Sequence, residues 1–361
     1  MRIIIDVMSG DNAPAELIKG ALIAVEEFPV DITIVGDETI IEDIVERDNL
    51  DLSRLTIVHA DDVINMEDKP LSVVRDKSNS SMSVGLRMLA AGEGDAFVSA
   101  GNTGALIAGA TLIVRRIKGV QRAGIATVLP LEKPMLLMDS GANLVVNEEN
   151  LEQFAMMGSI YMKKIFGIES PKVGQLNNGT EYNKGLPLQV EAYKRLSEVE
   201  GINFVGNIEG KEVPFAACDV LVTDGFTGNI LLKVVEGMGK FMLKTLKGVL
   251  TSTLTAKISA LGLLGQVKTV KKKFDASEYG GAPLLGISRP VIKAHGSSDA
   301  NAIKNAIRQA IQFVNTGINV EIAEYSVEFD RKKEEERQRE REEAEKAKEA
   351  ENSSKESDDS K

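Results

Sequence analysis

The sequence predicts an α/β fold with a parallel sheet that is covered by helices on both faces. Apolar runs of strand length alternate with helix-length patterns along most of the 361 residues, which is the arrangement of successive βαβ units. Strands are expected at 3–7, 32–35, 55–59, 96–99, 124–129, 136–139, 172–176, 203–205 and 220–223. Helices are expected between most of them, for instance at 15–27 and 148–166. In such folds ligands bind at the carboxyl ends of the strands, so the residues that follow each strand are the informative ones.

Composition excludes several classes of protein. The net charge of −11 and the absence of Trp argue against nucleic-acid binding. A single cysteine, Cys218, excludes an internal disulfide framework and suits the reducing cytoplasm. The apolar run around Cys218 favours a buried structural thiol over a nucleophile. No apolar stretch reaches the roughly 20 residues that a membrane span needs.

Known cofactor and metal motifs are missing from the sequence. It has neither a Walker A loop nor a GxGxxG fingerprint after a strand. There is no CxxC or HExxH motif, and His59 and His295 are the only histidines. We therefore predict no cofactor and no metal site.

Two turns of the form Gly-x-Thr-Gly follow strands and open helical patterns. One follows Ser99 and the other follows Asp224. Glycines let a backbone approach a ligand closely, and a helix start leaves unpaired N–H groups and a partial positive charge. We therefore predict that the two Gly-x-Thr-Gly turns form two walls of a phosphate site, although an ordinary turn remains the alternative for each. The residues concerned are Ser99, Gly101, Asn102, Thr103, Gly104, Asp224, Gly225, Thr227, Gly228 and Asn229.

Further polar turns follow other strands. Asp139 and Asn143 lie in one, and Glu181 and Lys184 lie in another beside glycines. After the first strand, Asp11 or Asn12 is expected to cap the next helix, with Pro14 in its first turn.

A histidine precedes the last helical pattern of the α/β region, 302–311. Ser298 or Asp299 is expected to cap that helix. His295, just before the cap, is either a positioned proton donor or a satisfied core histidine.

Residues 237–274 differ from the rest of this acidic chain. They contain eight lysines and no Asp or Glu, and leucines recur at three- and four-residue spacing. A basic amphipathic segment of this kind binds an anionic membrane surface, a partner helix or an acidic protein, or else it is a core-facing helix pair. The expected membrane contacts are Leu254, Ile258, Leu261, Leu263 and Leu264.

The last segment, 331–361, carries 22 charged residues out of 31 and no aliphatic side chain larger than Ala. It is predicted to be a solvated single helix that frays into disorder, outside the α/β region.

Four strings together resemble the bacterial phosphate acyltransferases of phospholipid synthesis (the acyl-carrier-protein:phosphate acyltransferase, or PlsX, family). They are SAGNTGAL at 99–106, VTDGFTGN at 222–229, GGAPLLG at 280–286 and HGSSDA at 295–300. The resemblance covers about residues 1–330. The chain departs from the family at three turns, where Ser9, Ser140 and the pair Asn178 and Thr180 replace its usual residues.

The resemblance implies a fold, a reaction and a set of partners. The fold would be a doubly wound α/β core like those of the isocitrate/isopropylmalate dehydrogenases and phosphotransacetylases. Residues 1–330 would form one catalytic domain, with 240–275 as a projecting helical pair. The reaction would convert acyl-ACP and inorganic phosphate to acyl phosphate and free acyl carrier protein. The expected partners are acyl carrier protein, inorganic phosphate, a second copy in a homodimer, the anionic inner face of the cell membrane and the membrane glycerol-3-phosphate acyltransferase.

On this interpretation, the site must place phosphate against a thioester carbonyl without a covalent enzyme intermediate. The amides of the 101–104 and 225–229 turns would hold the oxygens, and Lys184 would offset their charge. Asp139, Glu181 and Asp224 would orient Lys184 and the amides, and His295 would protonate the leaving thiolate. Two alternatives remain open: an isocitrate/isopropylmalate-type NAD-dependent dehydrogenase and a non-catalytic scaffold on the membrane surface.

Overall fold

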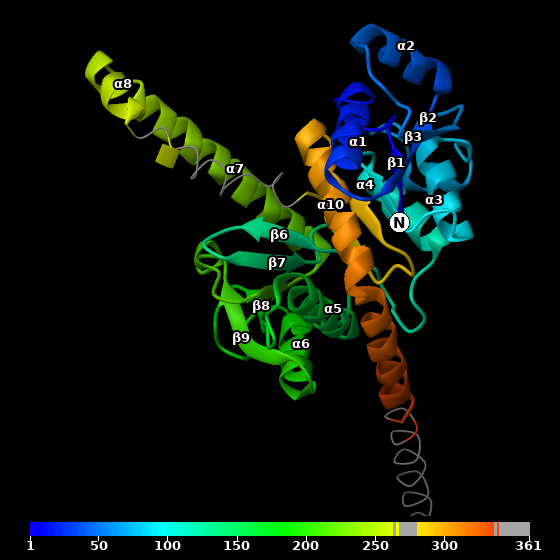
Figure 1. Ribbon diagram of the computed structural model, residues 1–361. Coiled ribbons are helices and arrows are strands. Elements are labelled where there is room, and N and C mark those ends of the chain that lie inside the picture. Colours follow the sequence, from blue (N-terminus) through cyan, green and yellow to red (C-terminus); the bar gives the residue numbers. More distant parts are fainter. Residues whose placement is uncertain (263–264, 267–279, 336–337, 339–361) are drawn as a thin grey trace, which may run out of the picture.

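The computed structural model describes residues 1–262, 265–266, 280–335 and 338, and it contains two sheets (Figure 1). The larger has the strand order β3-β2-β1-β4-β12-β11-β5 and the smaller β6-β7-β10-β8-β9. The larger comprises β1 Arg2–Asp6, β2 Asp31–Gly36, β3 Leu55–His59, β4 Ala96–Ser99, β5 Gly124–Ile125, β11 Ala282–Leu285 and β12 Val291–Lys293. The smaller comprises β6 Thr127–Pro130, β7 Pro134–Met138, β8 Lys172–Asn177, β9 Asn203–Glu209 and β10 Val220–Val222.

Most strands are parallel, as the alternation of strands and helices predicts. The exceptions are the pairs β11–β12, β11–β5 and β6–β7, which are antiparallel. The prediction of one strand over 124–129 is wrong. The chain breaks at Ala126, so that β5 pairs with β11 in one sheet and β6 pairs with β7 in the other. Strands β11 and β12 were not predicted, because both are short and lie between glycines and prolines.

The helices cover the sheets and supply the core. They are α1 Ala15–Glu27, α2 Glu38–Asp48, α3 Ser81–Ala91, α4 Thr103–Gly109, α5 Glu148–Phe166, α6 Pro187–Glu198, α7 Gly225–Leu250, α8 Leu254–Leu261 and α10 Ala300–Thr316. Helices α1 and α10 pack together on the larger sheet, and α5 and α6 pack on the smaller one. Cys218 is buried next to Met135 in the core of the smaller sheet, as predicted. Burial raises the pKa of its thiol to about 12.

The helix cap of α10 agrees with the sequence prediction, and that of α1 differs from it. Asp299 caps α10 and accepts a hydrogen bond from Ala302 N, as predicted. The prediction for α1 is wrong, because Pro14 occupies the cap position and makes no side-chain cap. The Asn12 amide instead donates to the Ser297 and Ser298 carbonyl oxygens, 3.1 Å away in each case. This cross-link fixes the loop after β12 to the loop after β1.

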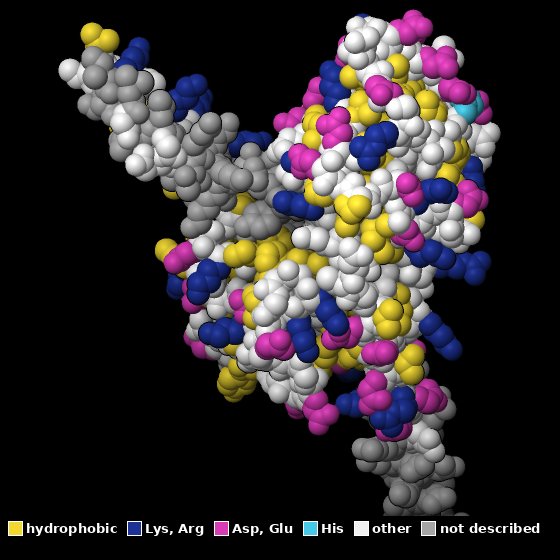
Figure 2. All heavy atoms as spheres, in the orientation of Figure 1, with side chains coloured by type: hydrophobic (Ala, Val, Ile, Leu, Met, Phe, Trp, Pro, Cys, Tyr) yellow, Lys and Arg dark blue, Asp and Glu magenta, His cyan; other side chains and the backbone are white. Residues whose placement is uncertain are grey.

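Helix α7 leaves the body and forms a projecting arm with α8 (Figure 1). Figure 2 shows Lys and Arg side chains along the upper edge of this arm. Five apolar side chains of α7 recur at three- or four-residue spacing, and each is 50–63% exposed. We call them the apolar stripe: Phe226, Ile230, Val234, Met238 and Phe241. Leu263 and Leu264 lie outside the described residues.

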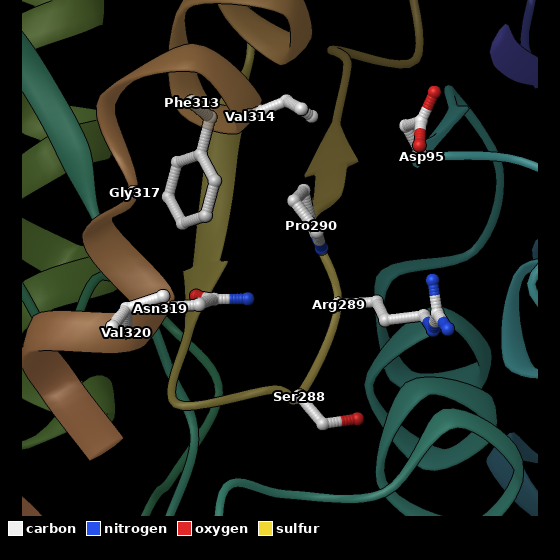
Figure 3. Close-up of a pocket in the computed structure, with 9 residues that line it drawn as sticks. All are labelled: Asp95, Ser288, Arg289, Pro290, Phe313, Val314, Gly317, Asn319 and Val320. Atoms are coloured by element: carbon white, nitrogen blue, oxygen red, sulfur yellow. The ribbon is translucent and has the colours of Figure 1, made fainter. Parts of the chain in front are cut away.

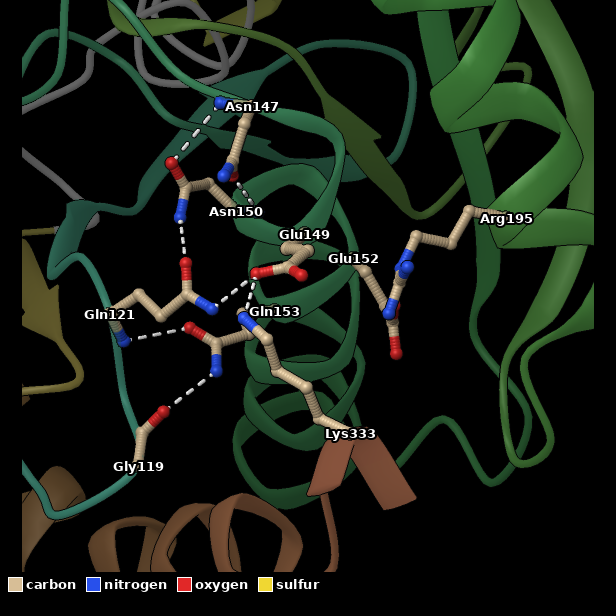
Figure 4. Close-up of polar contacts among 9 residues, drawn as sticks. All are labelled: Gly119, Gln121, Asn147, Glu149, Asn150, Glu152, Gln153, Arg195 and Lys333. Carbon is tan, nitrogen blue, oxygen red and sulfur yellow. Dashed lines mark hydrogen bonds and ion pairs between the residues drawn. The ribbon is translucent and has the colours of Figure 1, made fainter. Parts of the chain in front are cut away.

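A polar network holds the start of α5 and reaches the beginning of the charged C-terminal segment (Figure 4). Gln121 Nε2 donates to Glu149 at 2.6 Å, and the Gln121 backbone N–H donates to Gln153 at 2.9 Å. Lys333 pairs with the same Glu149 carboxylate, and both side chains are 18% exposed. Helical residues 318–335 follow α10. The first turn of the charged segment is therefore joined to the body by a partly buried ion pair.

Candidate functional site

A cavity of about 800 Å³ lies between α7 and the loops that follow β4, β7 and β12. Thr103, Gly141 and Asn229 line one part of it, and Lys293, His295 and Ser297 line another. Its wall therefore combines residues from the first Gly-x-Thr-Gly turn, from α7 just after the second one, from the HGSSDA string and from the turn after β7. This cavity is the candidate site.

The start of α7 packs tightly on the turn after β7. A Cβ placed on Gly228 would lie 1.9 Å from the Asp139 carbonyl oxygen, and one on Gly225 would lie 2.7 Å from the Asn143 carbonyl oxygen. Gly225 N also donates to the Asn143 carbonyl oxygen at 2.8 Å. Both glycines are thus required for the approach of α7 to the protein's own backbone.

Asp224 is the N-cap of α7. Its carboxylate accepts from Thr227 N at 2.8 Å and from the Thr227 hydroxyl at 2.7 Å. The Gly228 amide donates to the Asp224 carbonyl oxygen at 2.9 Å. The amides of Gly225, Thr227 and Gly228, which the sequence suggests as phosphate donors, are therefore already paired within the chain. Asn229, one residue further along α7, does line the cavity.

Asp139 is fully buried and organises the turn after β7. One carboxylate oxygen accepts from the amides of Ile125, Gly141 and Ala142 at 3.0–3.1 Å. The other accepts from the backbone and side-chain nitrogens of Asn143 at 2.7 and 2.8 Å. Burial raises the pKa of Asp139, while these hydrogen bonds oppose the rise. Asp139 thus orients the amides of its own turn and of Ile125, rather than those of the 101–104 and 225–229 turns that the sequence suggests. In doing so it sets the positions of Ser140 and Gly141 in the cavity wall.

Hydrogen bonds to the end of β1 and to residues 65–68 hold the turn after β4 in place. The Ser99 hydroxyl donates to the buried Asp6 carboxylate at 2.7 Å and accepts from Gly101 N at 3.1 Å. Asn102 caps α4 and donates to backbone carbonyl oxygens of residues 65, 66 and 68. Ser99 and Asn102 therefore shape the turn, whereas Gly101 and Thr103 face the cavity. Gly104 packs near Pro70.

Cationic side chains gather around the cavity. Lys233 and Lys240 reach it from α7, and Lys293 reaches it from the end of β12. Lys233 also pairs with Glu236 at 3.0 Å. Sequence reasoning missed Lys293 because β12 was not predicted. The apolar Val291-Ile292 pair directly before it was the available signal for a strand end.

His295 lies exposed at the rim of the cavity, and its Nδ1 is 2.9 Å from the Ser297 hydroxyl. Loss of hydration lowers the pKa of the imidazole; Lys233, Lys293 and Lys240 lower it further and Glu236 opposes them. The neutral ring is therefore the expected form near pH 7.

Lys184 and Glu181 do not join this cluster. Both are exposed, on the turn after β8, and neither lines the cavity. Lys184 N donates to the Glu181 carbonyl oxygen at 3.1 Å, which closes that turn. The structure therefore brings together the turns after β4, β7 and β10, and it leaves the turn after β8 apart.

A smaller cavity of about 350 Å³ lies elsewhere, between the 288–290 turn and the end of α10 (Figure 3). Arg289 and Asp95 are on its border, and Phe313 forms part of its apolar wall. None of the sequence-predicted site residues lines it. We therefore assign the chemistry to the larger cavity.

The fold belongs to the phosphotransacetylase-like class of α/β proteins. A phosphotransacetylase from Streptococcus pyogenes superposes with a TM-score of 0.60 at 17% sequence identity, over 87% of this chain and 94% of that one. The predicted fold class is thereby confirmed.

The sequence narrows this class to one family. The profile of the family described as "Fatty acid synthesis protein" matches residues 1–321, and the chain belongs to that family. A "Phosphate acyltransferase" of Thermoanaerobacter pseudethanolicus is 46% identical over 320 residues, 88% of this chain and 95% of the relative. A protein of the same name from Bacillus subtilis is 45% identical over 327 residues, 90% of this chain and 97% of the relative.

Among the described residues, no helix combines the length and the hydropathy that crossing a bilayer requires.

Proposed function

We propose that this protein transfers an acyl group from acyl-ACP to inorganic phosphate, producing acyl phosphate and free acyl carrier protein for phospholipid synthesis. The observation that carries the proposal is the identity of 46% over 320 residues with a protein named phosphate acyltransferase. The cationic cavity supports it, because phosphate and the oxyanion that develops on the thioester carbonyl both need positive charge. These relatives favour an acyltransferase over the dehydrogenase and scaffold alternatives.

The reaction depends on positioning phosphate against the thioester carbonyl more than on a general base. Near neutral pH phosphate is already an anion, so one of its oxygens attacks the thioester carbon directly. The new C–O bond forms as the C–S bond breaks, and the thiolate of the carrier takes a proton. The proton comes from the P–OH group of the hydrogen phosphate, and the neutral ring of His295, which lines the cavity beside Ser297, is proposed to accept it and pass it to the thiolate. Holding both substrates in one cavity removes most of the entropy cost of their encounter.

The acyl chain needs an apolar surface next to the cations. Val128 of β6 and Leu232 and Leu243 of α7 line the same cavity as His295. We propose that the chain lies along this wall, at the base of the α7 arm. Apolar burial of this kind is worth about 0.8 kcal/mol per methylene.

The acyl carrier protein is the proposed acidic partner. Lys240 of α7 lines the cavity, Lys244 and Lys247 lie further along the same helix, and Arg115 and Lys118 lie on the body. Lysines that lead to the mouth of a site accelerate the docking of an acidic protein.

The first test of the function is direct. Purified protein should release free acyl carrier protein from acyl-ACP only when inorganic phosphate is present, with stoichiometric formation of acyl phosphate. Release at the same rate without phosphate would indicate a thioesterase and would refute the proposal.

Lys184 lies outside the cavity in this structure, so the proposal that it acts on the charge of phosphate or of the oxyanion requires the turn after β8 to approach the bound substrates. Lys184→Ala should lower the rate of acyl-phosphate formation by about 100-fold or more, in line with the loss of one oxyanion-stabilising group. Its thermal midpoint should not change, because the side chain is exposed. Lys211→Ala, which removes another exposed lysine, is the control. Near-native turnover of the Lys184 variant would remove this residue from the mechanism.

Self-association is proposed through the apolar stripe on α7. Its five side chains are half exposed or more, and a continuous apolar face on a helix is normally covered by a partner. A homodimer joined through this face would place two arms side by side.

Peripheral binding to the inner face of the membrane is proposed through the end of the arm. Leu254, at the start of α8, is 76% exposed and lies near Lys257. Apolar side chains flanked by lysines suit the interface of an anionic bilayer. The membrane glycerol-3-phosphate acyltransferase, which would use the product there, is the proposed neighbour.

Leu254→Glu should weaken binding to phosphatidylglycerol vesicles by about tenfold or more, because it replaces methyl groups that the bilayer would bury with a charge that anionic lipid repels. Sedimentation with the vesicles measures the effect. Leu112→Glu changes a 53% exposed leucine on the body and should leave vesicle binding unchanged. Equal binding of wild type and Leu254→Glu would count against contact through α8.

A further inference from the structure

Lys293 is held in the cavity by the backbone of its own sheet. It is the last residue of β12, opposite Ser99 in the parallel pairing with β4. Its ammonium donates to the Ala100 carbonyl oxygen at 3.3 Å and to the Ala294 carbonyl oxygen. An ammonium has three N–H donors. Among the described residues no acceptor is recorded for the third, in a side chain that lines the cavity.

The charge of Lys293 is not neutralised by a direct ion pair with any residue that the structure describes. The buried carboxylate of Asp6 is the main source of negative potential at the ammonium, and Asp11 adds to it. That carboxylate is occupied by two hydroxyls, because Ser81 and Ser99 each donate to it at 2.7 Å. The lysine therefore presents an oriented positive charge to the cavity, at the junction of the β4 turn and the HGSSDA loop.

We propose that Lys293 binds phosphate oxygens directly and fixes the position of the attacking phosphate in the cavity. This inference rests on the proposed function and assigns a phosphate ligand to a residue outside the four recognised strings. Two carbonyl contacts hold the ammonium, so the entropy cost of ordering a long side chain is met before phosphate arrives. The third N–H and the positive charge are then available to a dianion.

The pKa of Lys293 gives a readout that a purely structural lysine would lack. Desolvation lowers this pKa to about 8, Asp6 and Asp11 oppose the effect, and Lys233 adds to it. A lysine binds phosphate only when it is protonated, so affinity is present below pH 8 and is lost as the pH rises through that value. The other titratable groups that line the same cavity are Glu236, Lys240, His295 and Asp299.

The kinetic test compares Lys293→Met and Lys293→Arg with wild type. Lys293→Met should raise KM for phosphate by about tenfold or more while KM for acyl-ACP changes less than twofold. Lys293→Arg should recover part of the affinity. It should also abolish the fall of kcat/KM for phosphate above pH 8, because a guanidinium does not titrate there. Lys211→Met, on an exposed turn residue that pairs with Glu209, is the matched control.

A binding test separates this inference from the proposed function. Millimolar inorganic phosphate should raise the thermal midpoint of wild type and of Lys211→Met, but not that of Lys293→Met. This shift does not depend on turnover, so it tests Lys293 even if wild type fails to release acyl carrier protein. A Lys293→Met protein that is stabilised by phosphate like wild type, or that keeps the wild-type KM for phosphate, would overturn the inference. If Lys293→Met does not fold, the wild-type and Lys293→Arg pH profiles decide: equal profiles would refute it.

Discussion

Gly228→Ala is expected to displace the start of α7 and to destabilise the protein by about 3 kcal/mol. The new methyl group would lie 1.9 Å from the Asp139 carbonyl oxygen, and a backbone atom at that distance cannot rotate away as a side chain can. Either the first turn of α7 or the turn after β7 must move. Thermal unfolding should show a midpoint lower by roughly 5–10 °C.

The same displacement should reduce activity. Asn229, Leu232 and Lys233 of α7 line the cavity within about one turn of Gly228, so a shift of the helix start changes the wall that faces the substrates. We expect phosphate-dependent release of acyl carrier protein to fall at temperatures where the variant is still folded.

Gly248→Ala provides a control on the same helix. No atom lies within 4 Å of a Cβ built at Gly248, so alanine should raise stability by about 0.5–1 kcal/mol through its better helix propensity. If Gly228→Ala lowers the stability and Gly248→Ala raises it, close packing at Gly228 causes the effect, and not the loss of a helical glycine as such. A Gly228→Ala protein with the wild-type midpoint would contradict the packing described for α7.

The alternation of strands and helices could be predicted from local sequence, because long periodic segments such as 15–27 and 148–166 specify their own structure. The division into two sheets could not. It depends on a break at Ala126 and on the pairing of the two-residue strand β5 with β11, more than 150 residues further along the chain. Such a short strand has too few residues to show a period, and its pairing is set by tertiary contacts.

What local sequence can predict is limited in a similar way at the glycine turns of the site. Glycine permits close approach, but the local sequence does not say what approaches. At Gly225 and Gly228 the neighbour is the protein's own 139–143 turn. The first Gly-x-Thr-Gly turn borders the cavity through Gly101 and Thr103, whereas only Asn229, the residue after the second turn, lines it on the α7 side. The location of the site stays a prediction, and the amides of Gly225, Thr227 and Gly228 already donate within the chain.

Asp139→Ala is expected to be the most damaging single substitution in the site. It would leave the buried amide of Ile125, three partly buried backbone amides and the Asn143 side-chain amide without their shared acceptor. Each unsatisfied donor costs about 1–3 kcal/mol, although the costs are not additive. We expect a loss of roughly 4–5 kcal/mol, a large fraction of the stability of a typical protein. The thermal midpoint and the soluble yield measure it.

Asp139→Asn separates the charge of this side chain from its shape. The asparagine oxygen can still accept from Ile125, Gly141 and Ala142, but its NH₂ group would face the two N–H groups of Asn143. Two donors in contact repel, so the loss should be smaller than for alanine but still about 2 kcal/mol. Asp37→Asn is the control, because Asp37 caps α2 in solvent by accepting from the Thr39 and Ile40 amides. Asparagine caps helices about as well as aspartate, so that variant should be close to wild type. Equal effects at positions 37 and 139 would show that the buried carboxylate does not hold the turn that borders the cavity.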